Sequence, residues 1–489
     1  MSLALLSALG KPWIGTGDAP FHLDYVYQVA QGHLPQPYGL EFFPGAERYA
    51  HGRQYASAHP PLFYALAAWF AGGTLSLDSW TQAVLRIRLL NVVIGTLTVL
   101  ACTWVAWEST RVKRSSFVVA VGATAPLVTS FVLMSGDIYN DVLLALMSTL
   151  AIGMVLRCLH HGASWPRVLV LGLLSAIGML VKATFIVVLA VSVGGIVIVA
   201  IVRRVTDGRT HRSLLAATLC KIVLVIAIPV TASAWFYARN IGLSGAWNRS
   251  TPKAPLHGRE EKSLTDVLTS PQFYKAFFGQ LFGSTPTSVS GVDTSLVSLA
   301  LSMTALLALL VWSVRNARAW TQGATVDWVF TRLAPVGVFL GVYVAQMSHA
   351  VGYGQYNIRY FFPAIVVVGL LLGGGATACG RWSGLVTFGM MGVFGLSAVN
   401  YMGWLVTGRA ADMSLLDRTR SIGGQLEVNG FSPQLLKVFV LAFIVSSVMA
   451  GLATSLLATE EHAVSELRQA STDRKTVPSD AAVAASDEA

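Results

Sequence analysis

Long apolar runs separated by short polar loops constrain this chain more than any other feature. A run of roughly twenty apolar residues is long enough to cross a bilayer as a helix. Charged residues make up only 12% of the chain, about half the share of an ordinary globular protein. The sequence therefore predicts an all-α polytopic membrane protein. About eleven spans are expected, near 88–107, 117–134, 142–158, 167–181, 184–202, 214–238, 293–313, 329–349, 358–379, 384–407 and 434–457.

Basic residues in the short loops orient these spans, because cytoplasmic loops carry an excess of Lys and Arg. Such residues gather near 111–114, 203–212 and 315–318, and they agree on one topology. The net charge of +10 is spread over these loops and forms no single patch that would indicate nucleic-acid binding. We expect an outer segment 1–85, a transmembrane core 86–238, a large outer loop 239–292, C-terminal spans 293–457 and a disordered cytoplasmic tail 458–489.

Two parts of the first segment are unusual. The apolar stretch at its start is shorter than a span, so a twelfth, first span would be either missing or truncated. The stretch "HPPLFYALAAWFAGG" (59–73) begins with a double proline, which suits a helix start, and it is amphipathic and aromatic. We expect it to form a helix lying at the membrane surface.

Ionisable side chains are concentrated at the predicted outer ends of the spans. Polar groups near membrane depth are costly and usually mark a functional site. A carboxylate can act as a general base toward a hydroxyl, and cations can hold a phosphate as it leaves. This combination suits group transfer from a lipid phosphate. The candidates are Asp18, His22 and Asp24 in "GDAPFHLDY", His59, then Asp137, Asn140 and Asp141 in "SGDIYNDVLL", and the cations Lys182, Arg239 and Arg359.

Ordinary structural roles compete with each of these interpretations. Asp18 is also compatible with a turn or cap residue, since Asp is common in turns. Asp137 and Asn140 are equally compatible with capping a helix that begins near Asp141. His22 suits an orienting or packing role better than a ligand role. No spacing of His and Asp argues strongly for a metal site.

Several motifs, taken in order, carry a resemblance. An outer Asp is followed by "YQVAQGHLP", "HPPLFYAL", "RLLNVVIGTLTVL", an outer "ND", "LVKATFIVVL", "ARNIGLSG" and "IRYFFPA". Over roughly residues 15–380 the chain resembles the GT-C class of integral membrane glycosyltransferases. The likeness is to the bacterial relatives of protein O-mannosyltransferases and aminoarabinose transferases.

The resemblance implies an inverting glycosyltransferase. Its donor would be a sugar on a polyprenyl phosphate, and it would modify a lipid, glycan or protein acceptor of the cell envelope at the outer face of the cytoplasmic membrane. Asp18 matches the catalytic acid of the first outer loop, and Asp141 or Asp137 matches a second acid. The remaining matches are Lys182, Arg239 and Arg359 near the donor phosphate, and His59 and Tyr64 on the helix that roofs the cavity.

One departure from the family pattern bears on cofactors. Many members have an Asp-Glu pair where this chain has Asp18 and Ala19. The second carboxylate is therefore in doubt, and with it a divalent cation at that place; no cofactor follows from the sequence. Two other functions stay open. One is a transporter or flippase for a lipid-linked substrate, and the other is a GT-C scaffold that binds glycolipid without catalysis.

Overall fold

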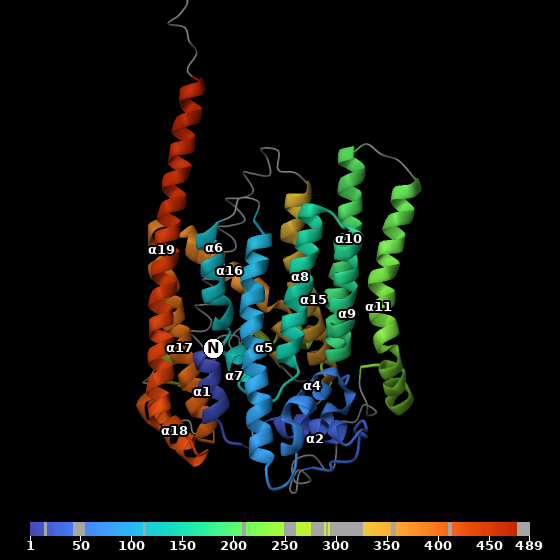
Figure 1. Ribbon diagram of the computed structural model, residues 1–489, viewed down its shortest axis with the longest axis vertical. Coiled ribbons are helices and arrows are strands. Elements are labelled where there is room, and N and C mark those ends of the chain that lie inside the picture. The colour runs from blue at the N-terminus through green and yellow to red at the C-terminus, as the bar shows by residue number, and fades with distance from the viewer. Residues whose placement is uncertain are drawn as a thin grey trace, which may run out of the picture.

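The protein is a bundle of long helices with shorter helices gathered at one end (Figure 1). The computed structural model describes residues 1–13, 17–42, 54–110, 114–207, 212–248, 261–274, 288–289, 292–293, 326–353, 358–408 and 413–476. Two short antiparallel strands form a hairpin, Ser288–Val289 (β1) and Val292–Asp293 (β2). The other regular structure in these residues is helical.

Eight helices in the described residues are long and apolar enough to cross a membrane. The prediction of a multi-pass helical membrane protein is thereby confirmed. These helices are α5 (Trp80–Glu108), α8 (Asp141–His161), α10 (Ile186–Asp207), α11 (Arg212–Ser244), α15 (Val326–Tyr353), η5 with α16 (Ile358–Ala364 and Ile365–Ala378), η6 with α17 (Gly380–Trp382 and Ser383–Val406) and α19 (Gln434–Thr476).

Three of the eleven predicted spans differ from this set. The run 117–134 is a pair, α6 (Ser115–Thr124) and α7 (Thr129–Ser135), bent by 73° around η3 (Ala125–Leu127). The break falls at Val128, whose backbone is extended, two residues after Pro126, which lacks an N–H and disfavours a continuous helix. Counting the pair as one span gives nine. The run 167–181 forms α9 (Trp165–Val181), a 17-residue apolar helix. The run 293–313 lies almost wholly outside the described residues.

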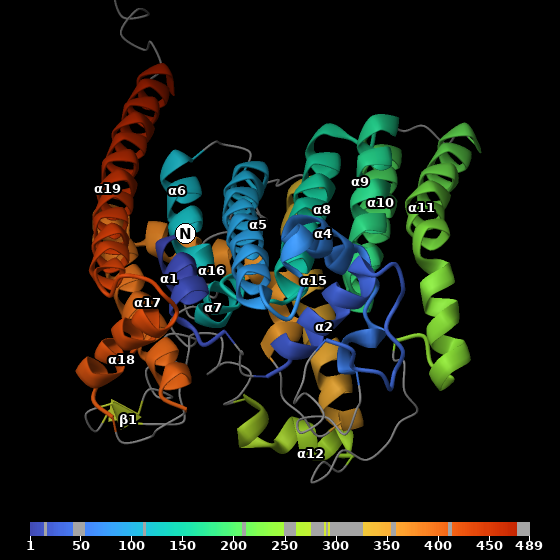
Figure 2. The same ribbon diagram turned by 60° about the horizontal axis from the view of Figure 1, so that its bottom comes forward.

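Short elements collect at the end of the bundle where α5 and α8 begin, which we call the α2 end (Figure 2). They are α1 (Ser2–Gly10), α2 (Ala19–Ala30), η1 (Tyr55–Ala58), α4 (Leu62–Ala71), η2 (Gly72–Thr74) and α12 (Leu264–Thr269). Helix α4, expected to lie at the membrane surface, buries Phe63 and Tyr64 and leaves Trp69 77% exposed. Its placement relative to a membrane remains a prediction.

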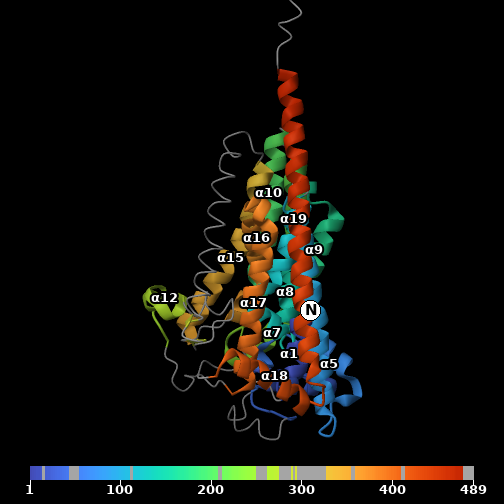
Figure 3. The same ribbon diagram turned by 90° about the vertical axis from the view of Figure 1, so that its left-hand side faces the viewer.

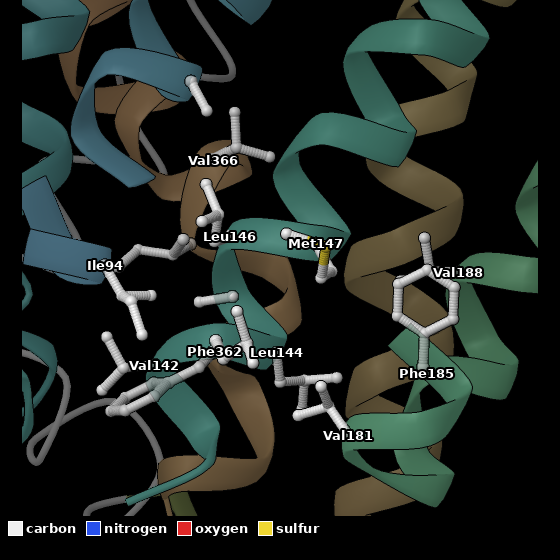
Figure 4. Packing of buried hydrophobic residues seen from close by; sticks show 14 of the residues in the cluster. Ile94, Val142, Leu144, Leu146, Met147, Val181, Phe185, Val188, Phe362 and Val366 are labelled. Atoms are coloured by element: carbon white, nitrogen blue, oxygen red, sulfur yellow. The ribbon is translucent and has the colours of Figure 1, made fainter. Parts of the chain in front are cut away.

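The main apolar core lies between α5, α8, α10 and α16. Ile94, Leu144 and Phe362 are among its buried side chains (Figure 4). Glycine permits one close approach in this core, because a Cβ on Gly373 of α16 would lie 2.8 Å from the backbone nitrogen of Val121. Helices α11 and α19 lie at opposite edges and expose many large apolar residues, as lipid-facing helices do (Figures 1 and 2).

The C-terminal part departs from the predicted disordered tail. Helix α19 continues without a break to Thr476, so residues 458–476 are helical (Figure 3). The sequence there is rich in Ala, Glu, Leu, Gln and Arg and has no Gly or Pro between Gly451 and Pro478, which favours a helix over disorder.

The first and last parts of the chain meet beside α1. Helix α18 (Leu415–Val428) ends at Asn429, whose side-chain amide donates to the carbonyl oxygens of Leu9 (2.6 Å) and Lys11 (2.7 Å). These carbonyls stand at the C-terminus of α1, where a helix leaves carbonyls without intrahelical partners. Asn429 therefore anchors the end of α1.

Candidate functional site

Four charged side chains from four parts of the chain meet at the α2 end. Asp18 directly precedes α2, Asp141 is the first residue of α8, Lys182 separates α9 from η4 (Ala183–Phe185), and Arg359 lies in η5. They form two ion pairs, Asp18 Oδ2 to Arg359 Nη2 and Asp141 Oδ1 to Lys182 Nζ, both at 2.5 Å. We call these four residues the paired cluster. The sequence predicted all four.

Asp18 is the accessible acid of the paired cluster. Its backbone carbonyl accepts hydrogen bonds from the N–H groups of Phe21 and His22 at the start of α2. Its carboxylate makes no capping bond and contacts Arg359 instead. The side chain is 42% exposed. Burial acts to raise the pKa of Asp18, but the charge and hydrogen bond of Arg359, together with His22 and Lys182, hold that pKa below its ordinary value. Asp18 is therefore ionised at neutral pH.

Asp141 and Lys182 form the buried half of the paired cluster. Their side chains are 1% and 6% exposed. Lys182 adopts an extended backbone between α9 and η4, so the chain turns there and the side chain reaches α8. The second oxygen of Asp141, Oδ2, has no hydrogen-bond partner among the described residues. Asn140 does not cap α8 with its side chain; it donates to the carbonyl oxygen of Val181.

Two histidines and a tyrosine lie beside Asp18. His22 Nδ1 is 2.8 Å from the Tyr64 hydroxyl, and the rings of His22 and His59 are stacked with centroids 6.0 Å apart. All three residues were predicted. Burial lowers the pKa of His22 to about 4 and that of His59 well below its ordinary value. Both are neutral at pH 7, which suits orientation more than electrostatic binding.

Two tyrosines contact the cations, and the sequence analysis missed both. The Arg359 guanidinium carbon lies 5.1 Å from the Tyr139 ring centroid, and Lys182 Nζ lies 5.0 Å from that of Tyr360. Such distances allow cation–π attraction. A signal was present for each, since Tyr139 stands within "GDIYND" and Tyr360 directly follows Arg359.

Asp137, a predicted catalytic residue, belongs to a different group of contacts. Its Oδ2 accepts from Lys11 Nζ at 3.1 Å, and its Oδ1 lies 3.9 Å from Arg88 Nε. The carboxylate side chain is 5% exposed. Burial acts to raise the pKa of Asp137, but the charges of Lys11 and Arg88 lower it overall. We call Lys11, Arg88 and Asp137 the buried triad. These contacts resemble a structural ion cluster more than a base that meets substrate.

Lys11 and Arg88 were not singled out from the sequence. Arg88 was placed at the start of a span beginning at 88, but α5 begins at Trp80, so Arg88 lies within the helix and is fully buried. Its guanidinium donates to the carbonyl oxygens of Ala8, Lys11 and Pro12 at the end of α1. An arginine inside an apolar run was the available signal.

The remaining predicted polar residues hold the first loop. The carboxylate of Asp24 accepts from the side chains of Gln28 and Gln54 and from the backbone N–H groups of Glu41 and Phe42. With both oxygens engaged, Asp24 does not supply a second acid beside Asp18.

Arg239, a predicted phosphate ligand, also contacts this loop. Its guanidinium donates to the carbonyl oxygens of Pro35 (2.5 Å) and Ser57 (3.4 Å). Its role toward a phosphate stays a prediction. Within the described part of the chain, no three His, Cys, Asp or Glu side chains come together as metal ligands would.

Part of the chain matches the model of a known family. Residues 34–241 match the family described as dolichyl-phosphate-mannose-protein mannosyltransferase. The match includes Asp137, Asp141, Lys182 and Arg239, while Asp18 and Arg359 lie outside it. No curated protein matches the chain by sequence.

Two solved structures are similar to the chain. One is ArnT from Cupriavidus metallidurans bound to undecaprenyl phosphate, with 13% identity over 94% of this chain and 75% of that one and a TM-score of 0.46. The other is the oligosaccharyltransferase AglB from Archaeoglobus fulgidus in complex with an inhibitory peptide and a dolichol-phosphate. It shows 13% identity over 93% of this chain and 55% of that one, with a TM-score of 0.43.

The order of motifs that suggested a membrane glycosyltransferase thus agrees with an independent match over the stretch that holds the second acid and its lysine. Residues 34–241 of this multi-pass membrane protein match the model of the dolichyl-phosphate-mannose-protein mannosyltransferase family, one of the groups that the order of motifs resembled.

Proposed function

We propose that the chain is an inverting glycosyltransferase. It takes a sugar from a polyprenyl-phosphate donor at the outer face of the cytoplasmic membrane and transfers it to an envelope lipid, glycan or protein. The observation that carries the proposal is the paired cluster, in which a half-exposed carboxylate and two cations lie at one end of a membrane bundle. The family match over residues 34–241 supports the donor class.

Asp18 is the general base in this proposal. Its ionised carboxylate takes the proton of an acceptor hydroxyl while that oxygen attacks the anomeric carbon. The new carbon–oxygen bond forms on the face opposite the phosphate, and the old bond breaks with its electron pair going to a phosphate oxygen. The lowered pKa of Asp18 keeps the base ready at neutral pH, and its 42% exposure lets an acceptor reach it.

Arg359 and Lys182 stabilise the leaving phosphate. Both cations lie in one cluster, and their aromatic contacts with Tyr139 and Tyr360 limit how far they move. Because charge accumulates on the phosphate as the sugar leaves, fixed cations act more strongly in the transition state than in the bound donor. Asp141 keeps Lys182 oriented, since Asp141 Oδ1 lies 2.5 Å from Lys182 Nζ and both side chains are buried.

A transporter of a lipid-linked sugar is the second candidate, and one observation favours it. Lys182 is buried at a break between two helices and is paired with an acid, as coupling residues of transporters often are. The half-exposed Asp18 with its own arginine is the feature that a transporter does not require. Catalysis and transport are separated by asking whether the sugar–phosphate bond is broken.

The test uses purified protein in detergent with a panel of polyprenyl-phosphate sugars and host envelope extract. Release of free polyprenyl phosphate is measured for the wild type, for Asp18→Asn and for the control Asp78→Asn, which changes an exposed acid before α5. We expect release from one donor, a loss of about 10³-fold in Asp18→Asn and no loss in the control.

Two results would overturn the proposal. Equal release by Asp18→Asn and wild type would remove Asp18 from catalysis. Donor binding without release by any protein, combined with movement of the intact donor across vesicle membranes, would favour the transporter instead.

A further inference from the structure

A path of contacts leads from the buried triad to the paired cluster. It begins at Asn91, one turn along α5 from Arg88 and fully buried. The Asn91 side-chain amide donates to the backbone carbonyl oxygens of Asp137 (2.6 Å) and Tyr139 (3.0 Å). One amide thereby fixes the backbone of the segment between α7 and α8, while the Asp137 side chain is held by Lys11 and Arg88.

The side chain of Tyr139 extends from this fixed backbone to the paired cluster. Its hydroxyl lies against Gly17, the residue before Asp18, where an added Cβ would be 3.2 Å from the Tyr139 oxygen. Its ring lies 5.1 Å from the Arg359 guanidinium and packs edge-on against His22, with centroids 5.1 Å apart. The residue is 5% exposed.

Tyr139 therefore lies against both sides of the accessible ion pair. Its hydroxyl meets the backbone at Gly17, directly before the acid, and its ring faces the cation, while its own backbone is held by Asn91. Neither contact involves the carboxylate oxygens of Asp18, which remain available to Arg359 and to an acceptor. Catalytic groups need a geometry fixed to a fraction of an ångström, and residues behind them usually supply it.

We propose that Tyr139 is a positioning residue, which holds the backbone directly before Asp18 and the Arg359 guanidinium in register and is itself fixed by Asn91. The inference rests on the proposed function for its catalytic consequence. The positioning itself is a property of the free protein and is measured without turnover.

The first experiment compares transfer kinetics of Tyr139→Phe, Tyr139→Leu and the control Tyr401→Phe. The control removes a tyrosine hydroxyl from α17, which packs in a different part of the bundle. For Tyr139→Phe we expect kcat to fall about tenfold with the donor KM within about twofold, because only alignment is lost. For Tyr139→Leu, which also removes the ring beneath Arg359, we expect a further fall of about tenfold. Melting temperatures in detergent show that each variant is folded.

The second experiment measures how closely Arg359 is held to position 18 through the reactivity of a thiol introduced there. Asp18→Cys is made in a background in which the four native cysteines are replaced, and its alkylation by iodoacetamide is followed against pH. Arg359 favours the thiolate and so lowers the pH at which the introduced thiol reacts. Adding Tyr139→Leu should raise that pH by about one unit, whereas adding Tyr401→Phe should leave it unchanged.

The results separate the two proposals. A shift in alkylation together with loss of kcat supports both. A shift in alkylation in a protein that transfers no sugar supports positioning and defeats the proposed function. Unchanged alkylation and unchanged kcat in both Tyr139 variants would overturn positioning. A raised donor KM with unchanged kcat would also overturn it, since Tyr139 would then bind substrate directly.

Discussion

The paired cluster and the buried triad are built from the same residue types but differ in how completely each acid is enclosed. Asp137 of the triad is held by Lys11, lies near Arg88 and is 5% exposed. Within the described residues, Asp18 of the paired cluster forms an ion pair with one cation, Arg359, and its side chain is 42% exposed. The two acids are connected through Tyr139, whose backbone carbonyl accepts from Asn91 on the triad side and whose hydroxyl lies against Gly17, the residue before Asp18.

This difference in exposure indicates which acid stabilises the fold and which one can react with a substrate. An ion pair buried on all sides cannot meet a substrate, and removing one partner leaves an uncompensated charge in an apolar surrounding. An acid that is half exposed and paired with a single cation can exchange protons with a bound molecule. Stability should therefore depend on the triad, and transfer on the paired cluster.

Asp137→Ala should have the largest effect on stability. It leaves Lys11 and Arg88 buried without their acid, at a cost of about 3–5 kcal/mol. We expect a sharp fall in the yield of folded protein and in its melting temperature in detergent, measured beside Asp18→Asn. Asp18→Asn should retain the wild-type melting temperature because its site is partly exposed. If Asp137→Ala melted like wild type while Asp18→Asn unfolded, the roles of the two regions would be reversed.

Arg359→Gln tests the charge on the accessible side. Arg359 holds the pKa of Asp18 below its ordinary value, so its removal lets that pKa rise. The base is then protonated at a higher pH, and the acidic limb of the kcat/KM profile should move upward by about one pH unit. Arg381→Gln, which changes an exposed arginine in η6, serves as the control and should leave the limb in place. An unmoved limb in Arg359→Gln would mean that Asp18 is not the titrating base.

Arg239→Lys should have the smallest effect. Lysine keeps the charge but not the planar fork that reaches the carbonyl oxygens of Pro35 and Ser57. We expect a loss of about 1 kcal/mol or less in stability and a change of less than about threefold in donor KM. If Arg239→Lys instead lost as much donor binding as Lys182→Met, Arg239 would contact the donor phosphate, as the sequence suggested.

The helical fold was predictable because a bilayer leaves an apolar run of about twenty residues little alternative to a helix. The ends of the helices were less predictable. One predicted span is bent at Val128, and α5 begins eight residues before the predicted start, so that Arg88 lies inside it. The helical continuation of α19 to Thr476 was missed because polar composition was interpreted as disorder.

The sequence predicted most residues of the candidate site, but it did not predict which of them form ion pairs with one another. Asp137 and Asp141 stand four residues apart in one motif and look equivalent in sequence. The structure pairs one with Lys11 and the other with Lys182, and nothing local indicates which. The distinction depends on α1 docking against α5, a contact between segments about eighty residues apart. Tyr139 was missed for the same reason, since its contacts are with Gly17 and Arg359, which are far from it in the sequence.

The contact of Asn429 with Leu9 and Lys11 has a consequence for the order in which the protein is made. The partners are 420 residues apart, so at roughly 5–20 residues per second the ribosome reaches Asn429 some 20 to 80 seconds after Leu9. During that interval the end of α1 has Arg88 but not its second anchor. The segment that leads to Asp18 therefore acquires this restraint only after α18 has been synthesised, and a ribosome that stalls before α18 would leave a nascent chain whose α1 is held from one side only.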